Sequence, residues 1–154
     1  MQYWLFKSEP HAFSIDDLAS RPNQTESGDG VRNYQARNFM RDDIKLGDLV
    51  FFYHSSCKVP AIVGTAQVVR ESHPDITCLD PKSKYYDYKS TKENPRWFVV
   101  DIKFKEKFKT PLTLKAIKED QAYAELPLIK KGQRLSIMPI PTNIAKLILK
   151  NIKD

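Results

Sequence analysis

The segment "LVFFYHSSCKVPAIVG", residues 49–64, decides the fold, because two apolar runs flank a short polar stretch. The aromatic and branched residues of the first run favour a strand, and "PAIVGTAQVVRES" favours another. Gly64 inside the second run indicates a bend or a bulge. The segment therefore predicts two strands, with His54, Ser55 and Ser56 at the end of the first one.

Capping residues mark two short helices before this segment. Ser14 is a good helix N-cap, and Asp17 three residues later completes an acidic capping box. Asn33 is placed to cap a second helix. The expected elements are a strand at residues 2–6, a helix at 14–20, a loop at 21–30 and a helix over about 34–41.

Hydrophobic periodicity organises the chain after this segment. Phe98, Val100, Ile102 and Phe104 alternate with charged or polar residues, which predicts a half-buried strand. The last apolar residues recur at helical spacing and predict a packed stripe, formed by Ile144, Leu147, Ile148 and Ile152. The expected elements are a connection at 72–95, a strand at 96–109, a helix capped by Thr113, a strand at 135–140 and a final helix capped by Thr142.

The element pattern predicts an α+β fold. Most of the five or six expected strands are not joined by long helical crossovers, which favours a mixed or largely antiparallel curved sheet or small barrel. The 154 residues contain no repeat or linker, so we expect a single domain over residues 1–154.

Charge is distributed unevenly along the chain. Residues 1–98 hold 13 basic and 13 acidic side chains, whereas residues 99–154 hold 12 basic and 6 acidic ones. The net charge of +6 therefore comes from the second part. A basic face suits a polyanion, because Lys and Arg displace counterions from phosphates. A merely solvated lysine-rich surface explains the charge equally well.

The sequence carries no sign of export or of a membrane span. Cys57 and Cys78 do not form a disulfide framework, which favours a reducing compartment. No apolar run approaches the roughly 20 residues that a membrane helix needs. The N-terminus lacks the pattern of a signal peptide, so we expect an intracellular protein without a membrane partner.

The residue patterns of common enzymes are missing. His54 and Ser55 are neighbours on an extended segment, so their side chains point to opposite faces, and no G-x-S-x-G elbow occurs. Cys57 has no second Cys/His pair at zinc spacing, and no phosphate-binding glycine motif is present. We expect no catalytic residue, no metal and no cofactor.

Polar residues lie beside aromatic residues at several predicted strand ends. Trp4 precedes Lys7, Ser8 and Glu9, and Tyr53 precedes His54. A pocket for a planar base needs this mixture, because aromatic faces stack on the base and polar groups read its edge. Each aromatic residue is also an ordinary core candidate, so the pattern indicates such a pocket without requiring it.

The chain resembles the EVE domain family over essentially its whole length. Six segments carry the resemblance, in order: "YWLFKSEP", "GVRNYQARN", "GDLVFFYHSS", "PAIVGTAQVV", "PRWFVVDI" and "GQRLSIMPI". The resemblance implies a PUA-like fold, a curved mixed sheet or pseudo-barrel flanked by short helices. It implies a nucleic-acid-binding module that reads a modified base, modified cytosine in DNA being the leading ligand and modified RNA the competitor.

The resemblance also implies a set of ligand-binding residues. By position these are Trp4, Lys7, Ser8, Glu9, Arg32, Asn33, Tyr53, His54, Ser55, Ser56, Trp97 and Ser136. One departure concerns Gly28, where many relatives carry a Trp. If that Trp stacks on the base, this chain uses Trp97 or Tyr53 instead, accepts another base, or binds weakly. The family implies a cytoplasmic location in a bacterium and a nuclear one in a eukaryote.

Three functions stay open from the sequence. A base reader predicts affinity that falls steeply with salt. A sensor of a free nucleotide or nucleoside predicts competition by mononucleotides and no gain from longer strands. An enzyme acting on a modified base lacks visible acid–base groups. The oligomeric state is open as well, with a monomer expected.

Overall fold

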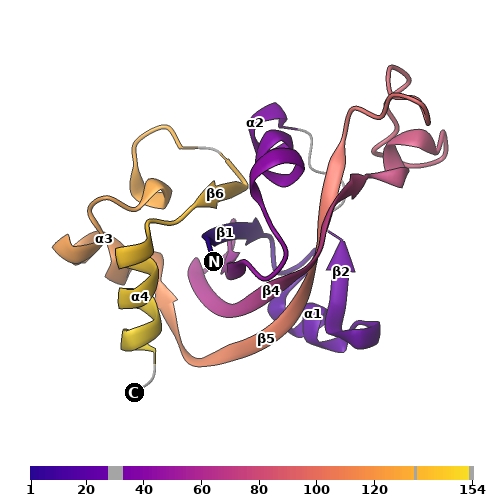
Figure 1. Ribbon diagram of the computed structural model, residues 1–154. Coiled ribbons are helices and arrows are strands. Elements are labelled where there is room, and N and C mark those ends of the chain that lie inside the picture. The colour runs from indigo at the N-terminus through magenta and orange to yellow at the C-terminus, as the bar shows by residue number, and fades with distance from the viewer. Residues whose placement is uncertain (28–32, 134, 153–154) are drawn as a thin grey trace.

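A six-stranded mixed sheet forms the centre of the computed structural model, which describes residues 1–27, 33–133 and 135–152 (Figure 1). The strand order is β2-β5-β4-β3-β1-β6. β1 pairs with β3 in parallel, and the other pairs are antiparallel. The strands are β1 Tyr3–Ser8, β2 Thr25–Ser27, β3 Leu49–His54, β4 Ala61–Pro74, β5 Phe98–Thr113 and β6 Ile137–Pro139. The predicted α+β class with a curved mixed sheet is confirmed.

Short helices flank this sheet. The α-helices are α1 Ile15–Ser20, α2 Tyr34–Asn38, α3 Leu114–Glu119 and α4 Thr142–Asn151. A π-helical turn, Phe39–Asp43, continues α2. Short 3-10 segments lie at η1 Pro22–Gln24, η3 Ile76–Leu79, η4 Gln121–Tyr123 and η5 Pro127–Ile129. No helix in the described ranges is long and apolar enough to cross a membrane.

Local side chains start three of these helices as predicted. The Ser14 hydroxyl accepts from the Asp17 N–H at 3.1 Å, and the Asp17 carboxylate accepts from the Ser14 N–H at 2.8 Å. Asn33 and Thr113 cap α2 and α3. The predicted Thr142 cap is wrong, because Pro141 occupies the cap position and no side chain accepts there. The φ of proline suits the entry into a helix, so Thr142 becomes the first helical residue.

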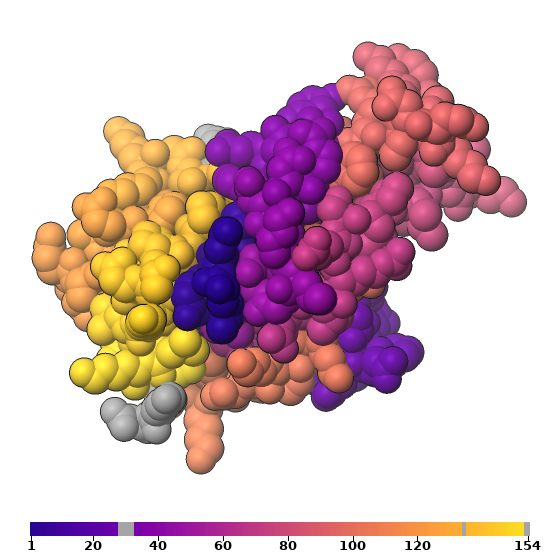
Figure 2. Space-filling view, viewed as in Figure 1, coloured from indigo at the N-terminus to yellow at the C-terminus, as the bar shows by residue number. Residues whose placement is uncertain are grey.

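Two predicted loops contain regular structure. Thr25–Ser27 lies in the expected loop at 21–30 but forms β2 against β5. Its polar sequence lacks an apolar alternation, so only the partner strand defines it. Within the expected connection at 72–95, β4 continues to Pro74 and η3 follows. The segment after η3 projects from the body of the molecule (Figures 1 and 2).

Gly64 allows β4 and β5 to approach closely. A Cβ atom on Gly64 would lie 2.3 Å from the backbone oxygen of Glu106, which is far below any normal contact. The β4 register with both neighbours shifts beside this residue. The predicted bulge is confirmed, and its cause is the close backbone approach.

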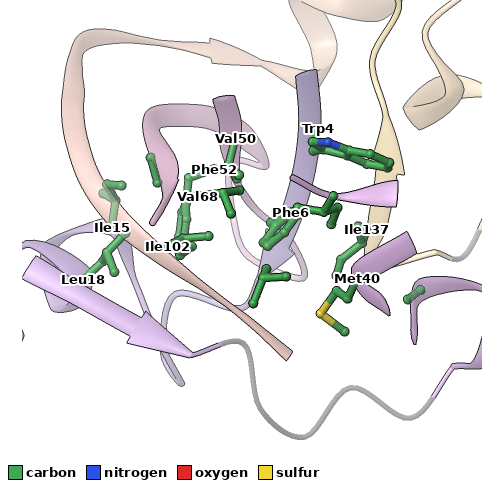
Figure 3. Packing of buried hydrophobic residues seen from close by; sticks show 14 of the residues in the cluster. Trp4, Phe6, Ile15, Leu18, Met40, Val50, Phe52, Val68, Ile102 and Ile137 are labelled. Atoms are coloured by element: carbon green, nitrogen blue, oxygen red, sulfur yellow. The ribbon is translucent and has the colours of Figure 1, made fainter. Parts of the chain in front are cut away.

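The sheet separates two apolar cores. Trp4 and Phe6 of β1 pack with α1 and α2 on one face, whereas Leu5 packs with α3 and α4 on the other. Figure 3 shows the first core around Phe6, Phe52 and Ile102. Both cysteines are free, as expected from their spacing. The predicted α4 stripe is confirmed too, with Ile144 and Ile148 buried in the second core.

Candidate functional site

A cavity of about 780 Å³ lies on the face of the sheet that carries the first core. This volume falls within the range of roughly 300–1,000 Å³ typical of small-ligand sites. Widely separated parts of the chain line it, with the residues Phe6, Lys7, Ser8, Glu9, Ala12, Phe13, Arg21, Glu26, Ser27, Asn33, Phe52, Lys84, Tyr85, Ile102, Ser136 and Ile137. The cavity is therefore a product of the tertiary fold.

The floor of the cavity is apolar. Phe6 and Phe52 come from the neighbouring strands β1 and β3, and Ile102 and Ile137 come from β5 and β6. All four side chains are buried in the first core. Because the core packing fixes these side chains, the floor is formed before any ligand arrives.

Two half-buried aromatic residues stand at the cavity walls, each with a cation against its ring. The guanidinium of Arg21 lies 5.2 Å from the ring centroid of Phe13 and also pairs with Glu26 at 2.8 Å. The ammonium of Lys84 lies 5.1 Å from the ring centroid of Tyr85. The walls thus combine aromatic surface with positive charge.

Hydrogen-bond acceptors surround this apolar floor. The Ser8 hydroxyl donates to the Phe13 carbonyl at 2.5 Å, and the Ser27 hydroxyl donates to Asp101 at 2.7 Å. With their protons engaged, both hydroxyls offer only lone pairs to a ligand. Glu9 and Glu26 add carboxylates. The arrangement suits a flat ligand that carries N–H groups on its edge.

The cavity brings together five of the predicted site residues, namely Lys7, Ser8, Glu9, Asn33 and Ser136. Strand alternation directs Lys7 away from the face that holds Phe6 and Ser8, so Lys7 borders the cavity from its edge. The Lys7 N–H donates to the Ser136 carbonyl at 2.8 Å. Burial lowers the pKa of the Lys7 ammonium. Arg32 and Gly28 lie outside the described residues.

Trp4 and Tyr53 are not among the described residues that line the cavity, contrary to the sequence prediction. Trp4 is 2% exposed, and its indole N–H donates to Asp48. Tyr53 belongs to the core on the other face of the sheet. Burial raises the pKa of its phenol. Neither ring is available to stack on a ligand in this cavity.

The polar end of β3 has a structural role in place of the predicted lining role. His54 Nε2 accepts from the Ile15 N–H at 3.1 Å, at the start of α1. The Ser55 N–H donates to the Ser8 carbonyl at 3.0 Å, and Ser56 takes a left-handed φ of 52° in the turn. These residues hold β1, α1 and the turn in place, and they are not among the described residues that line the cavity.

Trp97 is likewise placed away from the described cavity lining. Its ring stacks on Tyr34 at 4.9 Å between centroids, and its indole N–H donates to Asp87 at 2.8 Å. Arg37 lies over Tyr34 at 4.7 Å and donates to the Arg96 carbonyl. This cluster docks the projecting segment onto α2, so Trp97 supports the wall to which Tyr85 belongs.

Sequence reasoning missed several lining residues, above all Phe13, Arg21, Lys84 and Tyr85. Phe13 lies between the "KSEP" motif and α1, and this position next to predicted site residues could have marked it as a candidate for the lining. Lys84 and Tyr85 lie in a connection whose sequence interleaves lysines with tyrosines, a pattern typical of nucleic-acid surfaces. Within the described part of the chain, no group of three or more His, Cys, Asp or Glu side chains is placed to hold a metal ion.

Known proteins resemble this chain along most of its length. The chicken thymocyte nuclear protein 1 is 45% identical in a match that covers 90% of this chain and 63% of the chicken protein. This chain thus spans less than two thirds of that relative. A crystal structure from Pseudomonas putida is 45% identical with a TM-score of 0.90, and the match covers 96% and 97% of the two chains.

A structure of a human relative carries a ligand. The human THYN1 protein, solved in complex with 5-methylcytosine-containing DNA, is 37% identical with a TM-score of 0.92, and the match covers 100% of this chain and 99% of the other. The model of the EVE domain matches residues 2–151. With this match and these relatives, the chain belongs to the EVE domain family.

Proposed function

We propose that this protein binds DNA that carries a modified base, with 5-methylcytosine as the leading candidate. The modified base leaves the duplex stack and enters the 780 Å³ cavity. The cavity itself carries the proposal, because an apolar floor, aromatic walls and nearby acceptors are what a planar heterocycle requires. The protein binds the base and does not transform it.

The acceptors around the cavity favour a base with an exocyclic amino group. Cytosine presents an N4 amino donor, and a methyl group at C5 adds apolar surface. Glu9 is suited to accept from the amino group, because its other partner, the exposed His11, is 3.4 Å away. Asn33 also lines the cavity, and its side-chain amide offers N–H donors for the acceptor atoms of the base.

The ligand of the human relative supports the choice of DNA and of 5-methylcytosine. That protein was solved with DNA containing this base, and its fold superposes on the whole of this chain. Extruding a base costs a few kcal/mol, and stacking offsets it by roughly 1–3 kcal/mol per base. Phosphate contacts from the basic second part of the chain add to this stabilisation.

The direct test is fluorescence anisotropy with matched oligonucleotides. The set contains DNA and RNA, single and double stranded, with cytosine, 5-methylcytosine, 5-hydroxymethylcytosine or N6-methyladenine at one position. We expect tighter binding to one modified cytosine in DNA. Tyr85→Ala removes a wall and lowers that affinity about tenfold, in keeping with the stacking energy of one base.

Tyr88→Ala is the matched control, because Tyr88 lies on the same segment, is 75% exposed and is not among the described residues that line the cavity. Glu9→Gln is expected to weaken binding of cytosine and 5-methylcytosine alike, because both bases present the N4 amino group that Glu9 is proposed to accept from. Equal affinity for all oligonucleotides would overturn the proposal. Competition by mononucleotides with no gain from longer strands would point to a free nucleotide instead, and a preference for RNA would point to the RNA reader.

A further inference from the structure

A second hollow adjoins the base cavity. It measures about 360 Å³, and its described lining residues come from the start of α2 and from the turn before β6. We call it the lysine cleft, and the described residues that line it are Asn33, Gln35, Lys130, Lys131, Gly132, Gln133 and Leu135. Asn33 lines both hollows, so the two lie next to each other.

The lining of the lysine cleft is rich in donors. It contains two ammonium groups and three side-chain amides, and no carboxylate occurs among the described lining residues. Lys131 has no ion pair within the described ranges, and Lys130 reaches Glu125 only at 3.5 Å between two exposed side chains. Such an exposed pair holds its lysine weakly. The cleft therefore offers positive charge that the fold itself does not neutralise.

Backbone and side-chain hydrogen bonds hold the turn in shape. The Lys130 N–H donates to the Pro127 carbonyl at 3.0 Å, and the Gln133 N–H donates to the Lys130 carbonyl at 3.2 Å. Gly132 supplies the left-handed φ of 80° that the turn needs. The Gln133 side-chain oxygen accepts from the Leu135 N–H at 2.8 Å, which directs its amide as a donor. The backbone of the turn and the side-chain amide of Gln133 are thus positioned before a ligand binds.

We infer that the lysine cleft binds a backbone phosphate of the strand whose base occupies the cavity. This inference rests on the proposed function. A phosphodiester presents only acceptor oxygens and a negative charge, which matches a lining that is rich in donors and has no carboxylate among its described residues. A nucleotide joins its base to its phosphate through one sugar, which matches two hollows that share Asn33. Lys130 and Lys131, which contribute to the positive net charge of residues 99–154, then contact this phosphate.

The test compares two double variants that remove equal charge. Lys130→Ala with Lys131→Ala empties the cleft of its cations, whereas Lys118→Ala with Lys150→Ala removes exposed lysines of α3 and α4. Each is titrated with an oligonucleotide that holds one 5-methylcytosine, with the same oligonucleotide unmodified, and with free 5-methyl-2′-deoxycytidine, at several salt concentrations. Melting temperatures check that all proteins are folded.

The cleft variant is expected to bind both oligonucleotides about tenfold more weakly at low salt and to lower the slope of log K against log[salt] by about one to two. Its affinity for the free nucleoside changes less than twofold. An unchanged slope, or an equal effect in the control variant, would overturn the inference. If the wild-type protein ignores the methyl group, the proposed function fails, while the slopes on unmodified DNA still decide whether the cleft takes a phosphate.

Discussion

The indole Nε1 of Trp4 donates a hydrogen bond of 3.0 Å to the carboxylate of Asp48, and both side chains are almost wholly buried. The same carboxylate accepts from the backbone N–H groups of Gln2 and Lys45 at 3.0 and 2.9 Å. Asp48 thereby joins β1 to the turn that precedes β3. Trp4 is an anchor of the core, which explains why its ring is not among the described residues that line the cavity.

Asp48→Ala is expected to lower the free energy of unfolding by about 3 kcal/mol, because the buried indole N–H of Trp4 and the backbone N–H groups of Gln2 and Lys45 lose their acceptor. Asp48→Asn costs less, since its remaining oxygen still accepts from two of the donors. Asp43→Ala is the control, because Asp43 is exposed and lies nearby in the chain. Urea denaturation measures all three proteins, and equal losses in Asp48→Ala and Asp43→Ala would contradict the anchoring role.

Gly64→Ala is expected to destabilise the protein by more than about 3 kcal/mol or to prevent folding, because backbone atoms of β5 cannot yield to the new methyl group. Gly47→Ala is the matched comparison. A methyl group on Gly47 would meet no atom within 4 Å, but its φ is 88°, so only the backbone conformation costs energy, about 1 kcal/mol. Thermal unfolding measures the contrast, and a mild effect at Gly64 would show that the strands separate easily.

Three of the helix starts could be predicted from the sequence, because the capping interactions that form them span three residues. The capping box of Ser14 and Asp17 and the Asn33 cap need no knowledge of the rest of the fold. The cavity is different. Lys7, Ser8 and Glu9 were found because they follow the first predicted strand, in a motif shared with the EVE domain family. Lys84 and Tyr85 reach the cavity only when the projecting segment docks on α2.

The error at Tyr53 shows what a strand pattern leaves undecided. Neighbouring residues on a strand point to opposite faces, so choosing between Phe52 and Tyr53 chooses the face of the sheet. Both residues are aromatic, and both faces of this sheet are apolar. Nothing in the local sequence distinguishes them. The structure places Phe52 in the floor of the cavity and Tyr53 in the opposite core.

His54 is expected to make stability depend on pH below about 6.5. Burial lowers its pKa from 6.5, and the raising effect of Asp16 does not reverse the shift. The neutral ring is needed to accept from the Ile15 N–H. Because the unfolded histidine binds a proton more readily, its stabilising contribution is present above pH 6.5 and is lost as pH falls through the folded pKa. Urea midpoints from pH 8 to 5 measure this loss.

His54→Gln is the informative comparison for this pH dependence, because glutamine retains an acceptor but does not titrate. Its urea midpoint is expected to fall less between pH 8 and pH 5 than that of the wild type. His11 and His73 are present in both proteins, so the difference isolates His54. Identical pH profiles would show that protonation of His54 does not affect folding.

Trp97→Ala and Tyr85→Ala are expected to have different effects, because Trp97 supports the cavity wall from behind whereas Tyr85 is proposed to contact the base. Trp97 is 5% exposed and stacks on Tyr34, so its truncation costs about 3–5 kcal/mol and speeds amide exchange in the projecting segment. Tyr85 is half-buried at the cavity, so its truncation costs no more than about 1 kcal/mol yet weakens binding of the modified base about tenfold. Denaturation, hydrogen exchange and anisotropy on both variants measure the difference. Lost binding in Trp97→Ala with unchanged stability and exchange would mean that Trp97 contacts the base directly.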